Sequence, residues 1–274
     1  GSLWNNPNQP PGPVEHQIVE EMPYWVGVRA FANVDEFLAD NPDSGVFTIS
    51  AARPFSGLVE TSDSAIYYGS ATNATINYND GEEWFQVGLT QFCPYAEVAG
   101  SATSDSTTLG GISYLDDIIL INNLSDIGLV FEDSFAQIGN EIVRIDSVNY
   151  DSDGDVESIS VGRGCLDTVP TEHPEGTSIY FWQEFYGSDY QQYFAGETYT
   201  YALRPRNNTG ILPLADAPTT VMTYDSRGIR PYPPGNVKIN GVPYPTDYFL
   251  GPLEITWSHR DRLQQTGEII VDTT

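Results

Sequence analysis

Residues 142–161 of the chain, IVRIDSVNYDSDGDVESISV, decide the prediction of its fold. Ile142 to Ile145 and Ile159 to Val161 are rich in the β-branched residues that favour strands. Between them, Asp151 to Gly154 supplies residues that tolerate positive φ and form tight turns. A strand, a turn and a second strand in this order predict a β-hairpin.

The same pattern of strands and turns recurs along the chain. Tyr24 to Val28 (YWVGV) and Val46 to Ile49 (VFTI) predict two more strands, while Asn79 to Gly81 and Asn240-Gly241 predict tight turns. The apolar stretch Asp116 to Asn123 is too short for a helix, so it predicts a strand buried on both faces.

One short helix is predicted, at Asn33 to Ala39 (NVDEFLA). Asn33 can cap it, acidic residues lie in its first turn, and Asn41-Pro42 stops it. The other ordered segments have strand character. We therefore expect an all-β chain of several small β domains, sandwich-like or barrel-like.

Changes in composition divide the chain into regions, and the clearest boundary is the Pro-rich hinge that begins at Arg230, because proline fixes φ and removes a donor from the sheet. The predicted regions are residues 1–13, a tag and Pro-rich lead; 14–92, an N-terminal β region with one short helix; 93–229, one or more central β domains; and 230–274, the hinge and a partial module.

Three strands are predicted in the last region, at Val237 to Ile239, Leu253 to Trp257 and Glu268 to Val271. A Trp that ends an alternating strand after a Pro-rich linker resembles the opening of a fibronectin type III sandwich, which takes roughly 90–100 residues. Because this region is much shorter, we expect the sequence to stop inside that module.

The chain is strongly acidic. Lys and Arg number 11 against 38 Asp and Glu, which gives a net charge of −27 and an isoelectric point near 4.1. Nucleic acid and anionic lipid would both be repelled, so we predict neither as a partner. No apolar run exceeds four residues, the length of Ile118 to Ile121, so no membrane insertion is predicted. We interpret the acidity as a solvated exterior, with cation binding by part of it as the alternative.

A candidate calcium site lies in the turn of the opening hairpin. Asn149, Asp151, Asp153 and Asp155 place oxygen side chains at alternate positions, as in the first half of a calcium loop. The position that should carry a bidentate Glu is Ser160, and strands flank the segment instead of helices. The sequence therefore favours a tight hairpin turn, and calcium is kept as the alternative.

The most distinctive tract runs from Val161 to Thr168 (VGRGCLDT). Glycines allow unusual φ there, and an Arg can bond carboxylates or carbonyl groups. We predict a structural corner, and its residues are Arg163, Gly164, Cys165, Asp167 and His173.

Motifs of catalysis are absent from the sequence, which has no HExxH, GxSxG, P-loop or GxGxxG pattern. Its three histidines, His16, His173 and His259, stand far apart, and each has a plain structural explanation. We predict no catalytic residue, no cofactor and no enzymatic activity.

The two cysteines, Cys93 and Cys165, are too far apart in sequence for a zinc motif and too few for a disulfide framework. Two buried thiols are the expected state. A single long-range disulfide is the alternative.

Five blocks of the sequence, in this order, resemble tail proteins of long-tailed bacteriophages, namely tail-tip or hub proteins of siphophages and gene transfer agents. The resemblance covers roughly residues 90–265. The blocks are Phe92 to Pro94; Ile138 to Asp146; Val161 to Thr168 with His173 and Gly176; Arg230 to Pro234; and Thr256 to Arg262.

The resemblance implies a tail-tip protein of β domains followed by fibronectin-like modules, located in the virion tail after assembly in the bacterial cytoplasm. Its implied partners are other tail proteins, copies of itself, and a glycan or protein of the host surface. No catalytic residue is carried over. Because Cys93 and Cys165 both lie in matched blocks, the resemblance also implies a joint role for them, as reduced thiols packed together or as a bonded pair.

The leading hypothesis is therefore a non-enzymatic structural component of a phage tail tip that acts in assembly and host-surface recognition. A carbohydrate-binding or adhesion module is the alternative, because 17 Tyr and 5 Trp offer faces on which sugars stack. A glycan-cleaving enzyme is the third reading, and it would require two carboxyl groups about 5–10 Å apart in a groove.

Overall fold

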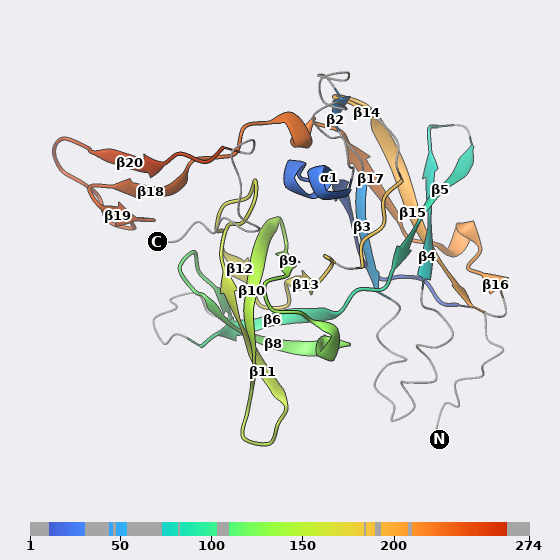
Figure 1. Cartoon of the computed structure of the whole chain (residues 1–274), viewed down its shortest axis with the longest axis horizontal. Helices are drawn as coiled ribbons and strands as arrows, with labels where there is room; N and C mark the ends of the chain where they lie inside the picture. Colours follow the sequence, from blue (N-terminus) through green and yellow to red (C-terminus); the bar gives the residue numbers. More distant parts are fainter. Residues whose placement is uncertain are drawn as a thin grey trace. The chain divides into compact units, whose positions relative to one another are not determined.

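The structure is a computed structural model of the chain and is all-β in character (Figure 1). It describes residues 11–30, 44–45, 48–53, 73–81, 83–102, 110–183, 185–189, 193–207 and 210–261. The chain forms two compact units. Unit 1 contains Gly1–Cys93 and Glu184–Arg230, and unit 2 contains Pro94–Gln183 and Pro231–Thr274.

Unit 1 is built on a five-stranded antiparallel sheet. The order is β16-β15-β4-β5, and β17 also pairs with β15. The predicted turn at Asn79 to Gly81 joins β4 and β5; Gly81 has a φ of 108° and donates its N–H to Asn79 Oδ1 at 2.5 Å. The strands are β4 (Asn73–Asn79), β5 (Trp84–Gln91), β15 (Thr198–Asn207), β16 (Gly210–Ile211) and β17 (Thr219–Thr223).

Smaller elements complete unit 1. Two-stranded sheets pair β1 with β3 and β2 with β14. The bounds are β1 (His16–Glu21), α1 (Tyr24–Ala30), β2 (Ser44–Gly45), β3 (Thr48–Arg53), β14 (Tyr193–Phe194), η3 (Leu214–Asp216) and η4 (Arg227–Ile229).

Unit 2 contains a closed six-stranded barrel with the order β10-β11-β8-β6-β13-β9 (Figure 1). The hairpin predicted from residues 142–161 is its β10–β11 pair. The barrel strands are β6 (Tyr95–Ser101), β8 (Ile118–Ser125), β9 (Phe135–Ile138), β10 (Glu141–Tyr150), β11 (Val156–Gly162) and β13 (Ser178–Tyr180). Beside it, β7 (Gly111–Ile112) pairs with β12 (His173–Pro174), and η2 (Ile127–Leu129) follows β8.

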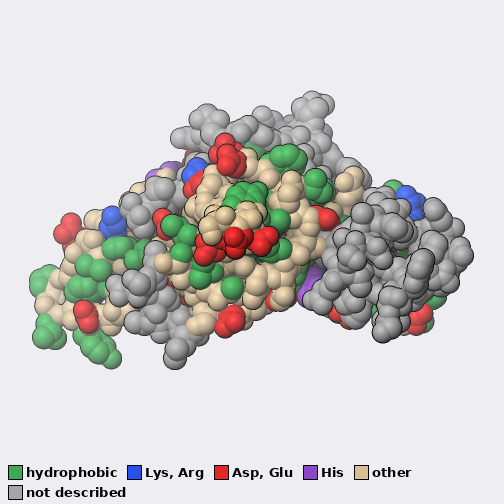
Figure 2. Space-filling model, turned by 90° about the horizontal axis from the view of Figure 1, so that it is seen from below, with side chains coloured by type: hydrophobic (Ala, Val, Ile, Leu, Met, Phe, Trp, Pro, Cys, Tyr) green, Lys and Arg blue, Asp and Glu red, His purple; other side chains and the backbone are tan. Residues whose placement is uncertain are grey.

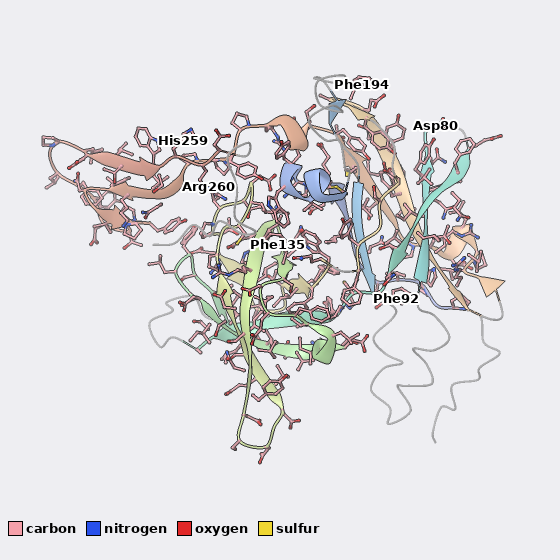
Figure 3. The ribbon with its side chains drawn as sticks, viewed as in Figure 1. Asp80, Phe92, Phe135, Phe194, His259 and Arg260 are labelled. Carbon is pink, nitrogen blue, oxygen red and sulfur yellow. The ribbon has the colours of Figure 1, made fainter. Side chains whose placement is uncertain are left out.

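The barrel core is aliphatic. Every barrel strand contributes at least one buried residue to it, among them Ile119, Ile138, Val143, Ile159 and Ile179. Alternation along each strand sends every second side chain into the barrel. Short segments rich in β-branched residues are therefore enough to fill its core. Phe135 at the start of β9 is fully buried and stacks on Trp182 with ring centroids 6.0 Å apart (Figure 3).

A three-stranded sheet with the order β19-β18-β20 forms the C-terminal part of unit 2. Its strands are β18 (Gly235–Ile239), β19 (Val242–Pro243) and β20 (Ile255–Ser258). The predicted turn at Asn240-Gly241 is confirmed, since φ is 51° and 80° at these residues. Positive φ at both positions is the signature of a two-residue hairpin turn.

The strand predicted at Tyr24 to Val28 is wrong, because these residues lie in α1. Pro23 has the fixed φ that suits the first turn of a helix, and its carbonyl group accepts hydrogen bonds from the N–H groups of Val26 and Gly27, both at 3.1 Å. Burial of Tyr24 and Val26 in this conformation outweighs their preference for strands.

Other predictions have mixed outcomes. Asp116 to Asn123 does contain a strand, β8, but only Ile119 and Ile121 are buried, while Ile118 and Leu120 on its other face are half-buried. The helix predicted at residues 33–39, part of the strand at 46–49, and the strand at 268–271 lie outside the described residues.

The chain passes between the two units near residues 93, 183 and 230. The predicted boundaries at 92 and 229 lie beside the first and third of these crossings. The second crossing falls inside the predicted central region of 93–229, whose last 46 residues, Glu184 to Ile229, return to unit 1 and supply β15 to its sheet. Strand pairing over such a long separation leaves no local signal in the sequence.

Candidate functional site

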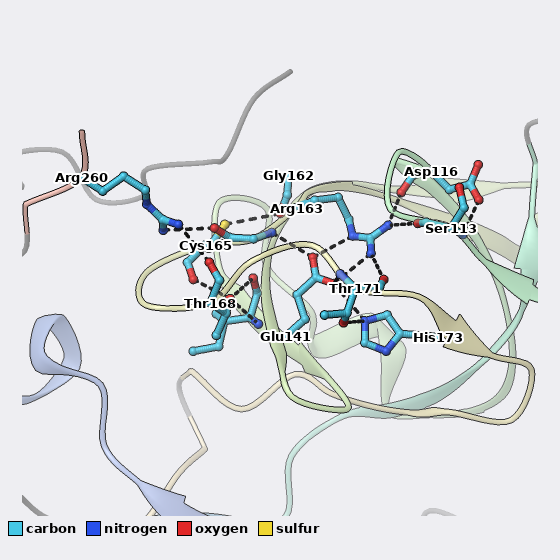
Figure 4. A network of polar contacts seen from close by, with 12 residues as sticks. Ser113, Asp116, Glu141, Gly162, Arg163, Cys165, Thr168, Thr171, His173 and Arg260 are labelled. Atoms are coloured by element: carbon cyan, nitrogen blue, oxygen red, sulfur yellow. Dashed lines mark hydrogen bonds and ion pairs between the residues drawn. The ribbon is translucent and has the colours of Figure 1, made fainter. Parts of the chain in front are cut away.

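A network of polar contacts surrounds the carboxylate of Glu141 in unit 2 (Figure 4). Glu141 begins β10, directly after the turn that joins it to β9, and its side chain is completely buried. Gly139 in that turn has a φ of 56°, and a Cβ there would lie 3.3 Å from Nδ1 of His173. The glycine thus allows both the tight turn and the close approach of the imidazole ring.

Five donors saturate this carboxylate. Arg163 bonds it in a bidentate manner, Nε to Oε1 and Nη2 to Oε2, both at 2.8 Å. The backbone N–H of Gly164 donates to Oε1 at 2.9 Å, and that of Thr171 donates to Oε2 at 3.0 Å. His173 Nε2 lies 2.9 Å from Oε2. We call Glu141, Arg163, Gly164, Thr171 and His173 the Glu141 network.

The guanidinium of Arg163 is equally well satisfied. Nη1 donates to the carbonyl oxygens of Ser113 and Asp116, both at 2.7 Å, and Nη2 donates to that of Thr171 at 2.6 Å. Together with the two bonds to Glu141, these contacts use all five N–H groups of the side chain. Three backbone segments are thereby held on one buried side chain.

Electrostatics fix the protonation state of Glu141. Burial alone would raise the pKa of its carboxyl group, but hydrogen bonds from Arg163 and His173 and the charge of Arg163 outweigh burial and lower the pKa to about 2. An ionised carboxylate only accepts hydrogen bonds, so Nε2 of His173 carries a proton and donates it to this contact.

An outer layer connects the network to the C-terminal part of unit 2. Arg260 donates from Nη1 to the carbonyl oxygen of Thr168 at 2.9 Å, and from Nη2 to those of Gly164, at 3.1 Å, and Leu166. Its guanidinium also lies over the ring of Tyr232, 5.7 Å from the ring centroid. Figure 3 shows Arg260 where the chain leaves β20.

The structure places most of the predicted corner residues together in unit 2. Arg163, Gly164 and His173 meet at Glu141, and the buried Cys165 follows them in the loop, where its thiol contacts the carbonyl oxygen of Gly162 at 3.4 Å. Asp167 is half-buried in the same loop.

Sequence reasoning missed the roles of Glu141, Thr171 and Arg260. A buried Arg and a buried His both need an acceptor, so their pairing with some carboxylate was the available signal. Nothing local identified which of 38 acidic residues supplies it.

The network is built to hold loops and offers little to a ligand. The carboxylate of Glu141 is completely buried and receives five hydrogen bonds, so it has no exposed oxygen with which to bind a substrate or a metal ion. The loop of residues 163–173 is therefore positioned by a saturated ion pair, in agreement with a structural corner.

The candidate calcium residues adopt the hairpin turn that the sequence favoured. Asp151 Oδ1 accepts hydrogen bonds from the N–H groups of Asp153 and Asp155, both at 2.9 Å. Asn149 points to the neighbouring strand, where its Nδ2 donates to the hydroxyls of Ser158 and Ser160 at 3.1 Å each. Among the described residues, no group of three or more His, Cys, Asp or Glu could hold a metal ion.

Unit 1 has a buried polar cluster of its own. Asp189 Oδ2 accepts hydrogen bonds from the hydroxyls of Tyr193, at 2.5 Å, and Tyr201, at 3.3 Å. The hydroxyls of Tyr201 and Tyr224 lie 2.5 Å apart, and the rings of Tyr193 and Tyr224 stack at 3.9 Å. Burial, together with the charge of Asp189, raises the pKa of Tyr193. These tyrosines are thus core residues of unit 1.

No disulfide joins the two cysteines, both of which are described and buried. Cys93 ends the first segment of unit 1, whereas Cys165 lies in the corner of unit 2. Burial raises the pKa of the Cys165 thiol to about 12, so the thiol stays protonated at neutral pH. The expectation of two buried thiols is confirmed, and the alternative of a disulfide is wrong.

These features define the class of the protein as an all-β chain of two units, one of which is built on a closed barrel with an internal ion-pair network. In comparison with known proteins, no family model and no curated protein matches the chain. Over the described residues, the structure contains no helix with the length and hydrophobicity needed to cross a membrane.

Proposed function

We propose that the chain is a non-enzymatic structural component of a bacteriophage tail tip, which acts in assembly and in recognition of the host surface. The observation that carries this proposal is the location of the sequence blocks that resemble tail proteins. Glu141 comes from the second block, Arg163 and Gly164 from the third, Tyr232 from the fourth and Arg260 from the fifth, and these residues contact one another in unit 2.

The convergence matters because the blocks are spread over more than 120 residues. If the blocks resembled tail proteins only in composition, their residues would have no reason to lie together in the fold. Instead, Glu141 pairs with Arg163, and Arg260 bonds the loop that follows Arg163. The resemblance therefore concerns the residues that hold one folded unit together. This supports a common fold with tail proteins, and the proposed function follows from that likeness.

Localisation in virus particles tests the proposal. Particles would be induced from the bacterium whose genome encodes the chain and labelled with gold-conjugated antibodies raised against it. We expect gold at the distal end of the tail. Labelling of the capsid, or of no particle component, would refute the proposal.

A second candidate is binding of a host-surface glycan, which two exposed aromatic residues favour. Trp257 and Tyr248 are 62% and 99% exposed, and the loop between β19 and β20 also carries Asp247 and Glu254. Aromatic faces beside carboxylates are the usual contacts of sugars. A glycan array probed with the purified chain and with Trp257→Ala tests this. Binding that disappears in the variant supports the candidate, and binding that is absent or unchanged rejects it.

A further inference from the structure

The C-terminal three-stranded sheet has one apolar face. Ile239 pairs with Ile255 on one side and with Val242 on the other, and directly opposed residues project from the same face of a sheet. Trp257 lies two residues beyond Ile255 and shares its face. Lys238 and its two partners, Thr256 in β20 and Pro243 in β19, occupy the opposite face. We call Ile239, Val242, Ile255 and Trp257 the apolar face.

This apolar face is open to solvent. Trp257, Ile255 and Val242 are 62%, 53% and 44% exposed, all four residues of β20 are exposed, and Ile239 is half-buried. In a sheet of this kind, the apolar face normally packs on a core and the polar face meets water. Figure 2 shows hydrophobic side chains gathered over this part of the molecule.

Further exposed apolar side chains lie in β18 and in the loop between β19 and β20. Val237 in β18 and Tyr248, Leu250 and Leu253 in the loop between β19 and β20 are also exposed. Larger exposed apolar patches on a protein mark surfaces that contact a partner. A standard protein interface buries about 800 Å² on each partner, whereas scattered hydrophobic residues on a monomer form smaller patches.

Charge indicates what can approach this surface. The whole chain has a net charge of −27, but between Gly235 and Arg260 the two basic residues, Lys238 and Arg260, balance the two acidic ones, Asp247 and Glu254. Two copies of so acidic a chain repel each other over most surfaces. The C-terminal sheet is a neutral segment where an apolar contact between copies meets little of that repulsion.

We propose that the apolar face is a self-association surface, on which the same face of a second copy packs to form a two-sheet sandwich. The contact is isologous, so each apolar side chain is buried twice, once in each copy. Face-to-face packing covers Trp257 and Ile255 in the way that the inner faces of a sandwich are covered. This inference deepens the proposed role in tail assembly and rests on it, since it names one partner of that assembly.

The anchoring of the sheet suits this role. Arg260, two residues after β20, is bonded to three carbonyl groups of the barrel corner, while Tyr244 after β19 stacks on Tyr114 at 4.6 Å. The sheet is thus attached to the rest of unit 2 at the end of β19 and again just beyond β20. A fixed surface loses less entropy on association than a mobile one.

The test is sedimentation of the full 274-residue chain over the micromolar concentration range. We expect a reversible monomer–dimer equilibrium. Trp257→Thr and Ile255→Thr each remove an apolar side chain from both copies and should weaken association by roughly 100-fold or more, because burial of one such side chain contributes about 1.5–3 kcal/mol. Thr256→Ala, on the opposite face of the same strand, is the matched control and should leave association unchanged.

Two results would overturn the inference. One is a wild-type chain that stays monomeric at all concentrations, which would assign the apolar face to a different occupant. The other is a dimer that Trp257→Thr does not weaken, which would place the contact elsewhere. Thermal unfolding of each variant shows whether the barrel is intact. Gold labelling of the tail is independent of both results, so failure of self-association and failure of the proposed function are distinguishable.

Discussion

Substitution of Glu141 by Gln tests whether the Glu141 network holds unit 2 together. The amide keeps the size of the side chain but removes its charge, and it replaces one acceptor oxygen by an NH₂ group that faces N–H donors. Arg163 then keeps a buried positive charge without its ionic partner. We expect a folded chain of reduced stability with a loosened loop at residues 163–173.

Two lines of reasoning give the same magnitude. Removal of one partner of a buried ion pair typically costs about 3–5 kcal/mol, because the other charge is left uncompensated. The pKa of Glu141 falls from an ordinary 4.5 to about 2, and linkage converts that difference into about 3 kcal/mol of stability at neutral pH. We expect Glu141→Gln to lower the free energy of unfolding of unit 2 by about 3 kcal/mol.

The sign of the pH dependence follows from the lowered pKa. Because Glu141 binds its proton more weakly in the folded chain, its stabilisation is complete above pH 4.5 and is lost as the pH falls toward 2. Glu141→Gln should therefore be less stable at neutral pH and should show a weaker loss of stability over that acid range than the wild type.

Urea unfolding measured by circular dichroism and tryptophan fluorescence supplies the free energies, and hydrogen exchange reports on the amides of Gly164 and Thr171 that donate to Glu141. Asp146→Asn is the matched control, because Asp146 forms an exposed pair with Arg144 and such pairs contribute at most about 1 kcal/mol. A loss below about 1 kcal/mol in Glu141→Gln, with both amides still protected, would refute the reasoning.

Three further predictions concern the same corner. Gly164→Ala should destabilise unit 2 by more than about 2 kcal/mol, since its Cβ would lie 2.4 Å from Pro170 Cδ; Gly154→Ala, at a positive φ with open space around it, controls for backbone strain, and equal unfolding free energies for the two variants would contradict the prediction. Arg260→Lys should lower stability by about 1–3 kcal/mol and speed proteolysis within residues 231–261, because an ammonium group lacks the planar fork that spans the three carbonyl groups; unchanged proteolysis would argue against the anchor. The Cys165 thiol, with its pKa raised to about 12 by burial, should stay unreactive toward a disulfide reagent at pH 8 until denaturant is added, and rapid reaction of the native chain would show that the corner opens.

Local features of the fold could be predicted from the sequence where the determinants are local. The β10–β11 hairpin and the turn at Asn240-Gly241 were predicted because β-branched runs and positive-φ residues are visible over a few positions. Tyr24 to Val28 shows the limit of that approach. Its composition favours a strand, but Pro23 starts a helix and burial selects it.

The network could be predicted only in part, because its members come from distant segments. Arg163, Gly164, Cys165 and His173 were grouped on the glycines and the Arg of one tract, whereas Glu141 is brought to them by barrel closure. When the barrel closes, β9 pairs with both β10 and β13. The register of these pairings cannot be predicted from a single sequence.

The position of Arg260 connects the two features on which the proposals rest. Its guanidinium reaches the carbonyl groups of the loop that Glu141 and Arg163 hold, and it lies two residues beyond β20 of the apolar face. Any loosening of the Glu141 network therefore loosens the anchor of the sheet. Glu141→Gln should therefore also weaken self-association, although it leaves the apolar face itself unchanged. A buried ion pair of this kind adds little net stability compared with an apolar core, so its value here is that it fixes one position for the sheet, which an assembly surface requires.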